Sequence, residues 1–274
     1  MPGFPDKPPE PVYWERVIHE QQTDASAPAL WRIHSDDVNG RLVRRWCAGR
    51  GGQIRMLKTD LFDEAVGAGL YPDLGEVSRH VVGIDLSLNA CKAAHSRHPA
   101  LAACVADVRT LPFPARAFDI IVSNSTLDHF PHEWEITRSL TQLSGVLREG
   151  GLLIITLDNP WNPAVWARAR LPFSTLRRWG LVPYFVGATL SVTGLTNALR
   201  TSGFSVLDTT ATLHCPRFVV IALARLMNRS SGRFQRRFLA VLRAFEGFER
   251  TPLRYLTGHF VAAAAVKQHE GGME

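Results

Sequence analysis

The stretch VVGIDLS at residues 81–87 decides the fold class, because an unbroken apolar run leads into an acidic residue and then a serine that can cap a helix. Further strand candidates, separated by segments of helical spacing, lie at residues 53–60, 101–106, 118–123 and 151–157. Strands without polar alternation are typical of a parallel sheet that helices cover on both faces. The sequence therefore predicts an α/β fold.

The remaining chain adds helices and two more strands. Helices are predicted within residues 12–48, over 87–95, 132–147 and 190–202, and in the segment 215–255. Gly150 and Gly151 are expected to end the helix over 132–147. Prolines interrupt the stretch after Asp158, and two further strands are predicted over 204–213 and 257–267.

This pattern indicates one large domain with additions. We expect residues 1–11 to form a flexible tail and residues 12–274 to form a single domain. Within that domain, residues 12–52 form an N-terminal helical cap. Residues 160–190 and 215–255 are expected to be insertions that act as lids over the site.

The composition is that of a folded globular protein, since 46% of the 274 residues are apolar and only 20% are charged. No apolar run approaches the roughly 18 residues that cross a bilayer, and the proline-rich N-terminus lacks an apolar signal segment. The four cysteines lie far apart in the sequence, which argues against a zinc knuckle or a redox pair. We expect a cytoplasmic protein with reduced thiols and no metal.

Positive charge is concentrated in one segment. The formal net charge is +6, and residues 215–255 carry nine arginines against two glutamates. An anionic membrane surface, a nucleic acid or an acidic partner could each compensate this charge. The arginines could equally face water while the apolar side of their helices packs on the sheet. Lysine is scarce, so nucleic-acid binding is the least favoured of these readings.

Polar residues stand where three successive strands end. Asp85 ends the second strand, Asp107 follows the third, and Asn124 follows the fourth. Ligands of open parallel sheets bind at the carboxyl ends of the strands. Asp85 could accept two hydrogen bonds from a ribose diol, and Asp107 could accept one from the exocyclic amine of adenine. Each acid taken alone could instead cap a helix.

Four motifs together resemble one enzyme family: VVGIDLS (81–87), ADVRTLPFP (106–114), FDIIVSNSTLDHF (118–130) and LREGGLLII (147–155). The chain is similar to class I, type 11-like S-adenosylmethionine-dependent methyltransferases. The resemblance implies a Rossmann-like, seven-stranded, mostly parallel sheet with helices on both faces, and S-adenosylmethionine as cofactor. The residues expected to bind the cofactor are Thr59, Asp60, Glu64, Asp85, Leu86, Asp107, Val108 and Asn124.

The first motif of that family is atypical here. A glycine-rich loop usually follows the first strand, whereas MLKTDLFDEAVGAG at 56–69 places Gly67 and Gly69 late. The acids of this loop could pair with the ammonium group of the cofactor instead. The departure also fits a non-catalytic binding module that uses its arginine-rich face on a partner or membrane. Neither a dinucleotide-binding GxGxxG after a strand nor a phosphate-binding Walker loop is present in the sequence.

Candidate catalytic residues are histidines near the strand ends. Methyl transfer requires alignment of a nucleophile with the methyl group, and a general base only if the nucleophile is protonated. His129, just past the fourth strand, is the first candidate base, and His214 is the second. Either could instead be structural. Asp128 is a substrate-side candidate that orients His129 only if geometry allows.

The predicted lids indicate the class of acceptor. The segment after the fourth strand, NSTL at 124–127, lacks the Asn/Asp-Pro-Pro-Tyr/Phe motif of enzymes that methylate base amines. Residues 161–190 are rich in large apolar side chains, and Trp161 and Tyr184 are the substrate candidates among them. We therefore expect a small, largely apolar acceptor, similar to a secondary metabolite or a lipid. A peripheral membrane contact would suit such an acceptor, and the sequence leaves the oligomeric state open.

Overall fold

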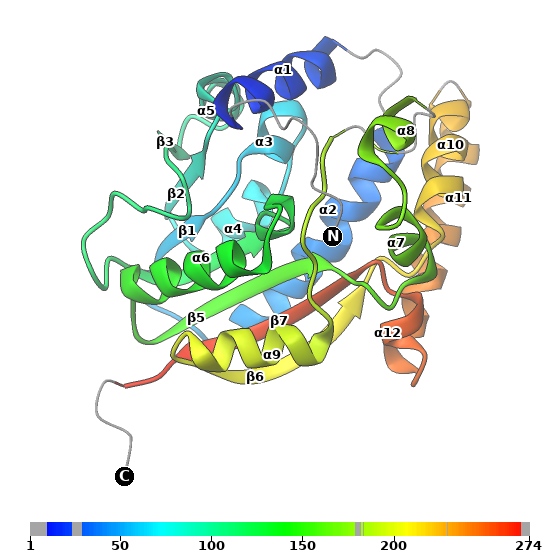
Figure 1. Ribbon diagram of the computed structural model, residues 1–274. Helices are drawn as coiled ribbons and strands as arrows, with labels where there is room; N and C mark the ends of the chain where they lie inside the picture. The colour runs from blue at the N-terminus through cyan, green and yellow to red at the C-terminus, as the bar shows by residue number, and fades with distance from the viewer. Residues whose placement is uncertain (1–9, 24–28, 179–181, 183, 229, 270–274) are drawn as a thin grey trace.

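The structure, a computed structural model, describes residues 10–23, 29–178, 182, 184–228 and 230–269. A seven-stranded sheet in the order β3-β2-β1-β4-β5-β7-β6 runs through its centre (Figure 1). The strands are β1 (Arg55–Lys58), β2 (His80–Asp85), β3 (Ala102–Val105), β4 (Phe118–Asn124), β5 (Leu147–Asp158), β6 (Phe204–Thr212) and β7 (Phe260–Lys267).

Strand direction confirms the predicted mostly parallel sheet. The strands β1 to β5 all run parallel to their neighbours. The last strand, β7, inserts between β5 and β6 and is antiparallel to both. The carboxyl ends of β1, β2, β3 and β4 therefore meet at one edge of the sheet, where a ligand of this kind of fold binds.

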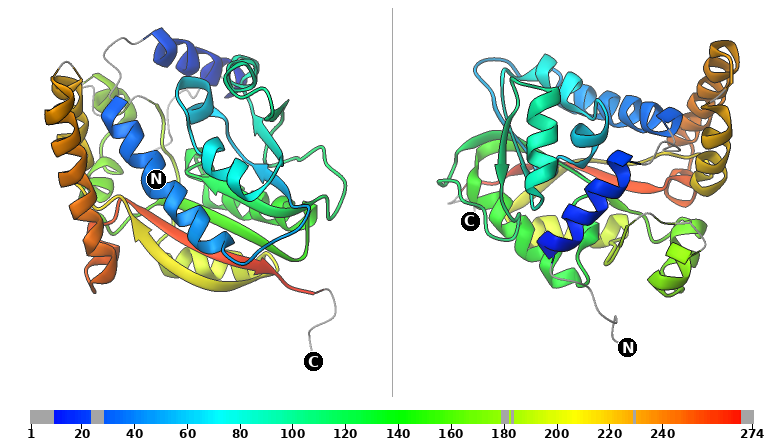
Figure 2. Two further views of the ribbon diagram at one scale, coloured as in Figure 1. Left: turned by 180° about the vertical axis from the view of Figure 1, so that it is seen from behind. Right: turned by 90° about the horizontal axis from the view of Figure 1, so that it is seen from above.

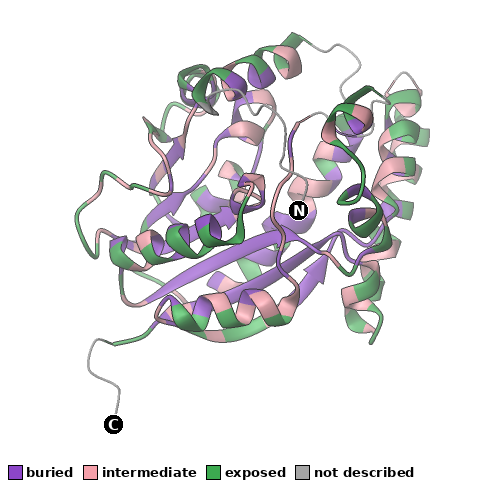
Figure 3. Cartoon of the chain, in the orientation of Figure 1, coloured by how far each residue is buried: buried purple, intermediate pink, exposed green. Residues whose placement is uncertain are grey.

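Helices cover both faces of the sheet (Figure 2). On one face, α6 (Glu133–Val146) and α9 (Val192–Thr201) bury Leu140 and Leu199 in a cluster with β4, β5 and β7. On the other face, α2 (Ala29–Cys47), α4 (Tyr71–Val77) and α5 (Leu88–Arg97) bury Val43, Leu74 and Cys91. Figure 3 shows β5 and β7 buried along most of their length, as the unbroken apolar runs predicted.

One predicted boundary is wrong. The helix α6 ends at Val146, and β5 begins at Leu147, so Gly150 and Gly151 lie inside the strand and do not stop the helix. Gly150 has a φ of +68°, which glycine adopts most easily. At this point the pairing of β4 with β5 shifts register, so the glycines allow an irregularity in the strand.

The N-terminal region is helical from its first described residue. The helix α1 spans Glu10–Thr23, so the last two residues of the predicted tail belong to a helix instead. Residues 1–9 lie outside the described part of the chain. Ser87 caps α5 as predicted, because its hydroxyl accepts a hydrogen bond of 3.0 Å from the Ala90 N–H.

The two segments predicted as lids are mostly helical. They form α7 (Pro163–Arg168), α8 (Phe173–Arg178), α10 (Arg217–Met227), α11 (Gly232–Phe245), the short 3-10 helix η2 (Glu246–Arg250) and α12 (Arg254–Thr257). All of them lie at one end of the molecule in the three views (Figures 1 and 2). Within the described residues, every helix is too short or too polar to span a bilayer.

Candidate active site

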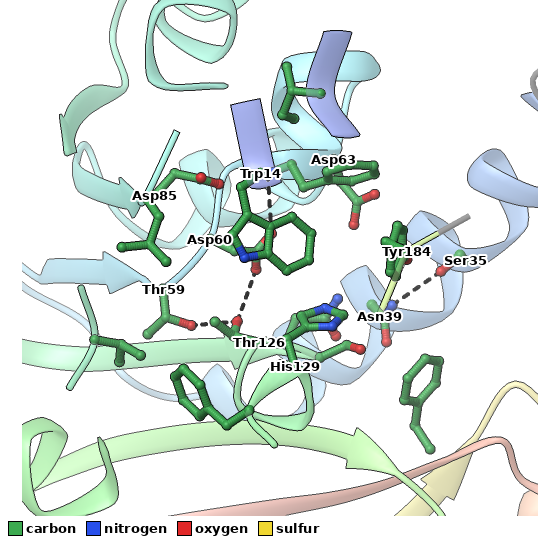
Figure 4. A pocket seen from close by; sticks show the side chains of 18 of the residues that line it. Trp14, Ser35, Asn39, Thr59, Asp60, Asp63, Asp85, Thr126, His129 and Tyr184 are labelled. Carbon is green, nitrogen blue, oxygen red and sulfur yellow. Dashed lines mark hydrogen bonds between the residues drawn. The ribbon is translucent and has the colours of Figure 1, made fainter. Parts of the chain in front are cut away.

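A single pocket brings the predicted strand-end residues together. It encloses about 1100 Å³ of empty space, its open mouth included, at the carboxyl ends of β1, β2, β3 and β4. In Figure 4, Thr59 and Asp85 lie on one side of it, and Ser35, Asn39 and Tyr184 lie on the other. Of the residues predicted from the sequence, those that line it are Thr59, Asp60, Asp85, Leu86, Asp107, Val108, Asn124, His129 and Tyr184.

Asp85 is fixed by two backbone donors. Its Oδ1 accepts from the Ser87 N–H at 2.8 Å, and its Oδ2 accepts from the Leu61 N–H at 3.0 Å. Burial raises the pKa of Asp85 to about 6, although these two donors oppose the shift. Each carboxylate oxygen keeps a lone pair that the backbone does not use, so the side chain can still accept from a diol in the pocket.

Asp107 is paired with a neighbour that the sequence analysis did not consider. The Arg109 guanidinium binds both carboxylate oxygens, with its Nη2 2.7 Å from Oδ2, and the Arg109 N–H donates to Oδ1 at 2.8 Å. Burial alone would raise the pKa of Asp107, but Arg109 lowers it overall. Arg109 also binds Glu135 of α6 at 2.7 Å. An adenine amine would therefore share Asp107 with this guanidinium.

The loop after β1 is tied to the end of β4 by hydroxyl groups. The Thr59 hydroxyl lies 2.7 Å from the Thr126 hydroxyl and 3.0 Å from that of Ser123. Thr126 in turn donates to Asp60 Oδ2 at 3.1 Å. Asn124, the last residue of β4, accepts from the Thr156 hydroxyl at 2.9 Å. These contacts hold the loop close to the pocket without a glycine-rich turn.

Glu64 lies beneath this loop, which corrects its predicted place in the site. It is fully buried, and its Oε2 lies 2.8 Å from Nζ of the buried Lys58. Its Oε1 accepts from the Leu70 N–H at 2.8 Å. Burial raises the pKa of Glu64, partly offset by Lys58, while the carboxylates around Lys58 outweigh burial and raise the pKa of that amine. Glu64 therefore organises the loop from below and does not line the pocket.

Asp63, an acid of the loop after β1, also lines the pocket. It belongs to the short helix α3 (Phe62–Val66). Burial, followed by the charge of Asp60, raises its pKa to about 6. Its carboxylate has no hydrogen bond or ion pair with the described residues. A cationic group of a ligand is thus its natural counter-charge.

His129, in the 3-10 helix η1 (Leu127–His129), lies in an aromatic setting. Its ring packs edge-to-face against Trp14 at 5.0 Å and Tyr184 at 5.3 Å between centroids. Its Nδ1 lies 2.9 Å from the backbone oxygen of Phe185. Since that oxygen only accepts, Nδ1 carries the proton, and Nε2 is the unprotonated nitrogen of the neutral ring.

Three other candidates lie outside the pocket lining. Asp128 is fully buried, and its Oδ2 accepts from the Ser125 hydroxyl and the Asp158 N–H, so it supports the chain around η1. His214 is buried, with its ring nitrogens 2.8 Å from the Thr257 hydroxyl and 3.0 Å from the Ala211 oxygen. Trp161 is 51% exposed on the surface. None of the three belongs to the lining of this pocket.

The Asp128 carboxylate nevertheless lies near the candidate base. Its Oδ1 is buried, has no hydrogen-bond partner in the described part of the chain and is 3.9 Å from His129 Nε2. Burial raises the pKa of Asp128, opposed by the charge that His129 would carry. The distance is too long for a direct hydrogen bond. Asp128 therefore does not hold the ring by a hydrogen bond.

Sequence reasoning missed most of the far wall of the pocket. On α2, Trp31, Ser35 and Asn39 face it at helical spacing, and the Asn39 Nδ2 donates to the Ser35 hydroxyl at 3.4 Å. Asn39 Oδ1 is buried and has no hydrogen-bond partner among the described residues. Arg217 adds a positive charge at the start of α10 and donates to Nε2 of His259 at 2.8 Å. Helical periodicity could have found the α2 face, but only the fold shows that it turns toward the strand ends.

One group of potential metal ligands lies elsewhere among the described residues. Donor atoms of His34, Cys215 and Glu246 lie within 4.8 Å of one another. Both oxygens of Glu246 already accept from the backbone N–H groups of Leu213 and His214, and Oε1 lies 3.2 Å from His34 Nε2. These contacts give the group a structural role in holding the connection between β6 and α10.

Comparison with known proteins agrees with this geometry. Residues 63–155 match a family model described as a methyltransferase domain. A probable S-adenosylmethionine-dependent methyltransferase of Mycolicibacterium smegmatis is 28% identical over 185 residues, which cover 67% of this chain and 63% of that protein. A phthiotriol/phenolphthiotriol dimycocerosates methyltransferase of Mycobacterium ulcerans is 33% identical over 98 residues, 35% of each chain.

A solved structure gives the same fold. An S-adenosylmethionine-dependent methyltransferase from Mesorhizobium loti superposes with a TM-score of 0.55 at 17% identity, covering 82% of this chain and 96% of that one. The fold, the strand-end pocket and the sequence matches are similar to those of class I S-adenosylmethionine-dependent methyltransferases. The match to the Mycolicibacterium protein spans less than two thirds of the length of that relative.

Proposed function

We propose that the protein transfers the methyl group of S-adenosylmethionine to a small, largely apolar acceptor. The observation that carries this proposal is one continuous pocket with strand-end carboxylates on one side and an aromatic wall on the other. Such a pocket holds a nucleoside cofactor and an apolar acceptor next to each other. Proximity and orientation of this kind contribute about 7–11 kcal/mol to bimolecular reactions.

The cofactor would occupy the strand-end side. Asp85 would accept from the ribose hydroxyls, with Leu86 beside the sugar. Asp107 and Val108 would bind the adenine edge, the former together with Arg109. Asp60 and Asp63 would face the ammonium group of the methionyl part, with Thr59 and Asn124 at the base of the pocket. The bound cofactor supplies an electrophilic methyl group on a sulfonium, and the protein's task is to orient the acceptor behind it.

The acceptor would occupy the side lined by α1, α2 and Tyr184. Trp14, Trp31 and Tyr184 offer apolar walls, while Asn39 Oδ1 offers an unused acceptor for one polar group. This combination favours a guest that is mainly hydrophobic with a single hydroxyl or amine. The similarity to a methyltransferase named for a lipid, over 35% of the chain, supports the same class of acceptor.

His129 would act as the general base when the acceptor is protonated. Its Nδ1–H is held by the Phe185 carbonyl, which leaves Nε2 to take a proton. A positioned base of this kind contributes typically about 10²–10⁴-fold to the rate. Asp128 would stabilise the resulting imidazolium by its charge at 3.9 Å.

We also propose the domain organisation expected from the sequence, with residues 12–274 as one domain and residues 12–52 as its cap. The segments 160–190 and 215–255 would act as lids. Tyr184 from the first segment and Arg217 from the second both line the pocket, which supports this assignment. The four unpaired cysteines support a reducing, cytoplasmic setting.

A non-catalytic binding module is the second candidate. The observation in its favour is Arg109, which occupies both oxygens of Asp107 where the base of the cofactor would bind. In this reading the fold is retained while the nucleoside site has lost its adenine contact. The module would then act through its arginine-rich helices.

The two candidates differ in cofactor binding, which calorimetry measures directly. We expect titration with S-adenosylhomocysteine to give a dissociation constant in the micromolar range, and Asp85→Ala to weaken it sharply. Asp119→Ala, which removes a carboxylate that does not line the pocket, is the matched control and should leave the dissociation constant unchanged. Absence of binding heat with the demethylated product and with S-adenosylmethionine itself would reject the enzyme and favour the module.

A further inference from the structure

The helices α10 and α11 carry an unusual density of positive charge. Between Pro216 and Phe245 the sequence contains seven arginines and no aspartate or glutamate. Two of these arginines are engaged elsewhere, since Arg217 lines the pocket and Arg243 lies 3.1 Å from Asp37 of α2. Arginine side chains that cluster without acidic residues repel one another unless an anionic surface compensates their charge.

Four further arginines on these helices face solvent. Arg225, Arg233, Arg236 and Arg237 are exposed, and none of them has an ion pair with the described residues. By contrast, Arg41, Arg44 and Arg45 of the adjacent helix α2 all pair with acids. The helices α10 and α11 therefore carry a cluster of unpaired charge that the adjacent helix α2 lacks.

Large apolar side chains are exposed among these arginines. Along α10, Val219, Leu223 and Leu226 lie on one face and are 56%, 42% and 69% exposed. On α11, Phe234 and Val241 are seven positions apart and more than half exposed. Apolar surface of this kind is unfavourable in water and usually marks an interaction site.

The opposite side of the same helices is already buried against the helix α2. Val220 and Ala224 of α10 and Leu242 of α11 are buried against Trp31 and Val38 of α2. The exposed apolar residues are thus a second, outward stripe and not the packing face of the helices. An amphipathic helix that only packed on the sheet would need a single stripe.

We propose that the outward face of α10 and α11 binds an anionic bilayer surface. We call this surface the α10–α11 face and define it by Val219, Leu223, Arg225, Leu226, Phe234, Arg236, Arg237 and Val241. Interfacial helices combine arginines with exposed aliphatic and aromatic residues in this way, because the charges bind headgroups while the apolar groups enter the acyl boundary. This inference stands independently of methyl transfer.

Neighbouring elements extend the same end of the molecule. Trp166 of α7 is 52% exposed, and the Arg170 guanidinium lies 3.5 Å from the centre of its ring. The helices α7 and α8 lie at the same end of the molecule as α10 and α11 (Figures 1 and 2). Exposed tryptophans beside arginines are typical of the headgroup region of membranes.

The apolar stripe favours a bilayer over a nucleic acid. A nucleic-acid surface binds phosphates with cations and stacks bases on aromatic rings, but aliphatic residues such as Leu223 and Leu226 gain nothing from it. A bilayer accepts both the charge and the aliphatic groups. Arg217, the first residue of α10, lines the pocket, so the bound face would also bring the pocket near the membrane.

Vesicle flotation with the full chain tests the proposal. We expect binding to vesicles of phosphatidylcholine mixed with phosphatidylglycerol, and at least about tenfold weaker binding to phosphatidylcholine alone. The triple variant Arg225→Glu, Arg236→Glu and Arg237→Glu should lose the preference for anionic vesicles. The double variant Leu226→Ser and Phe234→Ser should keep the preference but bind more weakly.

A charge-matched variant elsewhere provides the control. Arg79→Glu, Lys92→Glu and Arg200→Glu alter exposed cations that belong to other faces and have no ion pair with the described residues. This variant should bind vesicles like the unmodified protein. All variants should retain their binding of S-adenosylhomocysteine if the unmodified protein binds it, and their thermal unfolding reports folding in any case.

Three results would overturn the proposal. The first is equal binding to neutral and anionic vesicles. The second is an equal loss of vesicle binding in the control triple variant, which would mean that net charge matters and this face does not. The third is tighter binding to duplex RNA or DNA than to anionic vesicles at the same salt concentration.

Discussion

The Nδ1 atom of His129 lies 2.9 Å from the carbonyl oxygen of Phe185, a residue of the segment predicted as the first lid. This contact fixes the ring tautomer and joins the end of β4 to residues 160–190. The Phe185 N–H donates to the Tyr13 hydroxyl at 2.6 Å, so the same segment is also joined to α1. The sequence presented His129 as either catalytic or structural, and the geometry allows both at once.

Replacing His129 by Asn separates these two roles. The asparagine amide can donate to the Phe185 carbonyl as Nδ1 does, but it offers no base at the position of Nε2. We expect the rate of methyl transfer to fall by about 10²–10⁴-fold. The affinity for S-adenosylhomocysteine, measured by calorimetry, should not change.

His214→Asn is the comparison for this variant. Since His214 lies outside the pocket lining, its replacement should leave the rate of methyl transfer per folded molecule unchanged. An unchanged rate in His129→Asn would remove His129 from the mechanism and leave it as a structural contact.

Cofactor affinity should depend on pH through Asp85. Its pKa is raised to about 6, so the carboxylate that accepts ribose hydrogen bonds is present above that pH and is lost below it. We expect the affinity for S-adenosylhomocysteine to fall as the pH decreases through 6. Asp85→Asn should weaken binding by about 10- to 100-fold at neutral pH, as for lost hydrogen bonds to a charged acceptor.

A second carboxylate contributes to the same titration. The pKa of Asp63 is also raised to about 6. Asp85→Asn should therefore reduce the pH dependence, and the double variant with Asp63→Asn should abolish it. A pH dependence that is the same in the double variant and in the unmodified protein would show that neither acid binds the cofactor.

The strand-end residues could be predicted because local pattern determines them. Asp85 and Asn124 are placed by the apolar strands that precede them, and parallel strands bring their ends together whatever the rest of the chain does. The capping role of Ser87 follows from the same local logic. These parts of the fold need no knowledge of distant contacts.

Other parts of the site depend on contacts between distant segments. Trp14 and Trp31 reach the pocket from helices that precede the sheet in sequence, and nothing local shows which way those helices pack. Glu64 was predicted to face the cofactor, but the buried amine of Lys58 draws it under the loop. The pairing of Asp107 with Arg109, two residues further along the chain, depends on the conformation of the loop after β3, which the sequence pattern does not determine.

The buried pair of Lys58 and Glu64 should dominate the stability of the β1 loop. Lys58→Met removes the cation and leaves the Glu64 carboxylate buried without compensation. We expect the free energy of unfolding to fall by about 3–5 kcal/mol, measured by denaturant titration. The double variant Lys58→Met and Glu64→Gln removes both charges and should recover much of this loss. A double variant that is less stable than the single one would contradict this account.

A separate prediction concerns Gly69, the late glycine in the loop after β1. Gly69 has a φ of +59°, and a Cβ there would lie 2.5 Å from the carboxyl group of Glu64. Gly69→Ala therefore combines backbone strain with a clash against a buried acid, and we expect a loss of more than about 1 kcal/mol in the free energy of unfolding. Since Glu64 also holds Lys58, the loop and its pocket residue Asp60 should shift as well and weaken binding of S-adenosylhomocysteine.

Gly75→Ala is the matched control for that substitution. Gly75 lies in α4 without a positive φ, and a Cβ there meets no atom within 4 Å. Alanine is favoured over glycine inside a helix by roughly 0.5–1 kcal/mol, so this variant should be as stable as the unmodified protein or slightly more so. If Gly69→Ala were equally well tolerated, neither the positive φ of Gly69 nor its close packing against Glu64 would constrain this position.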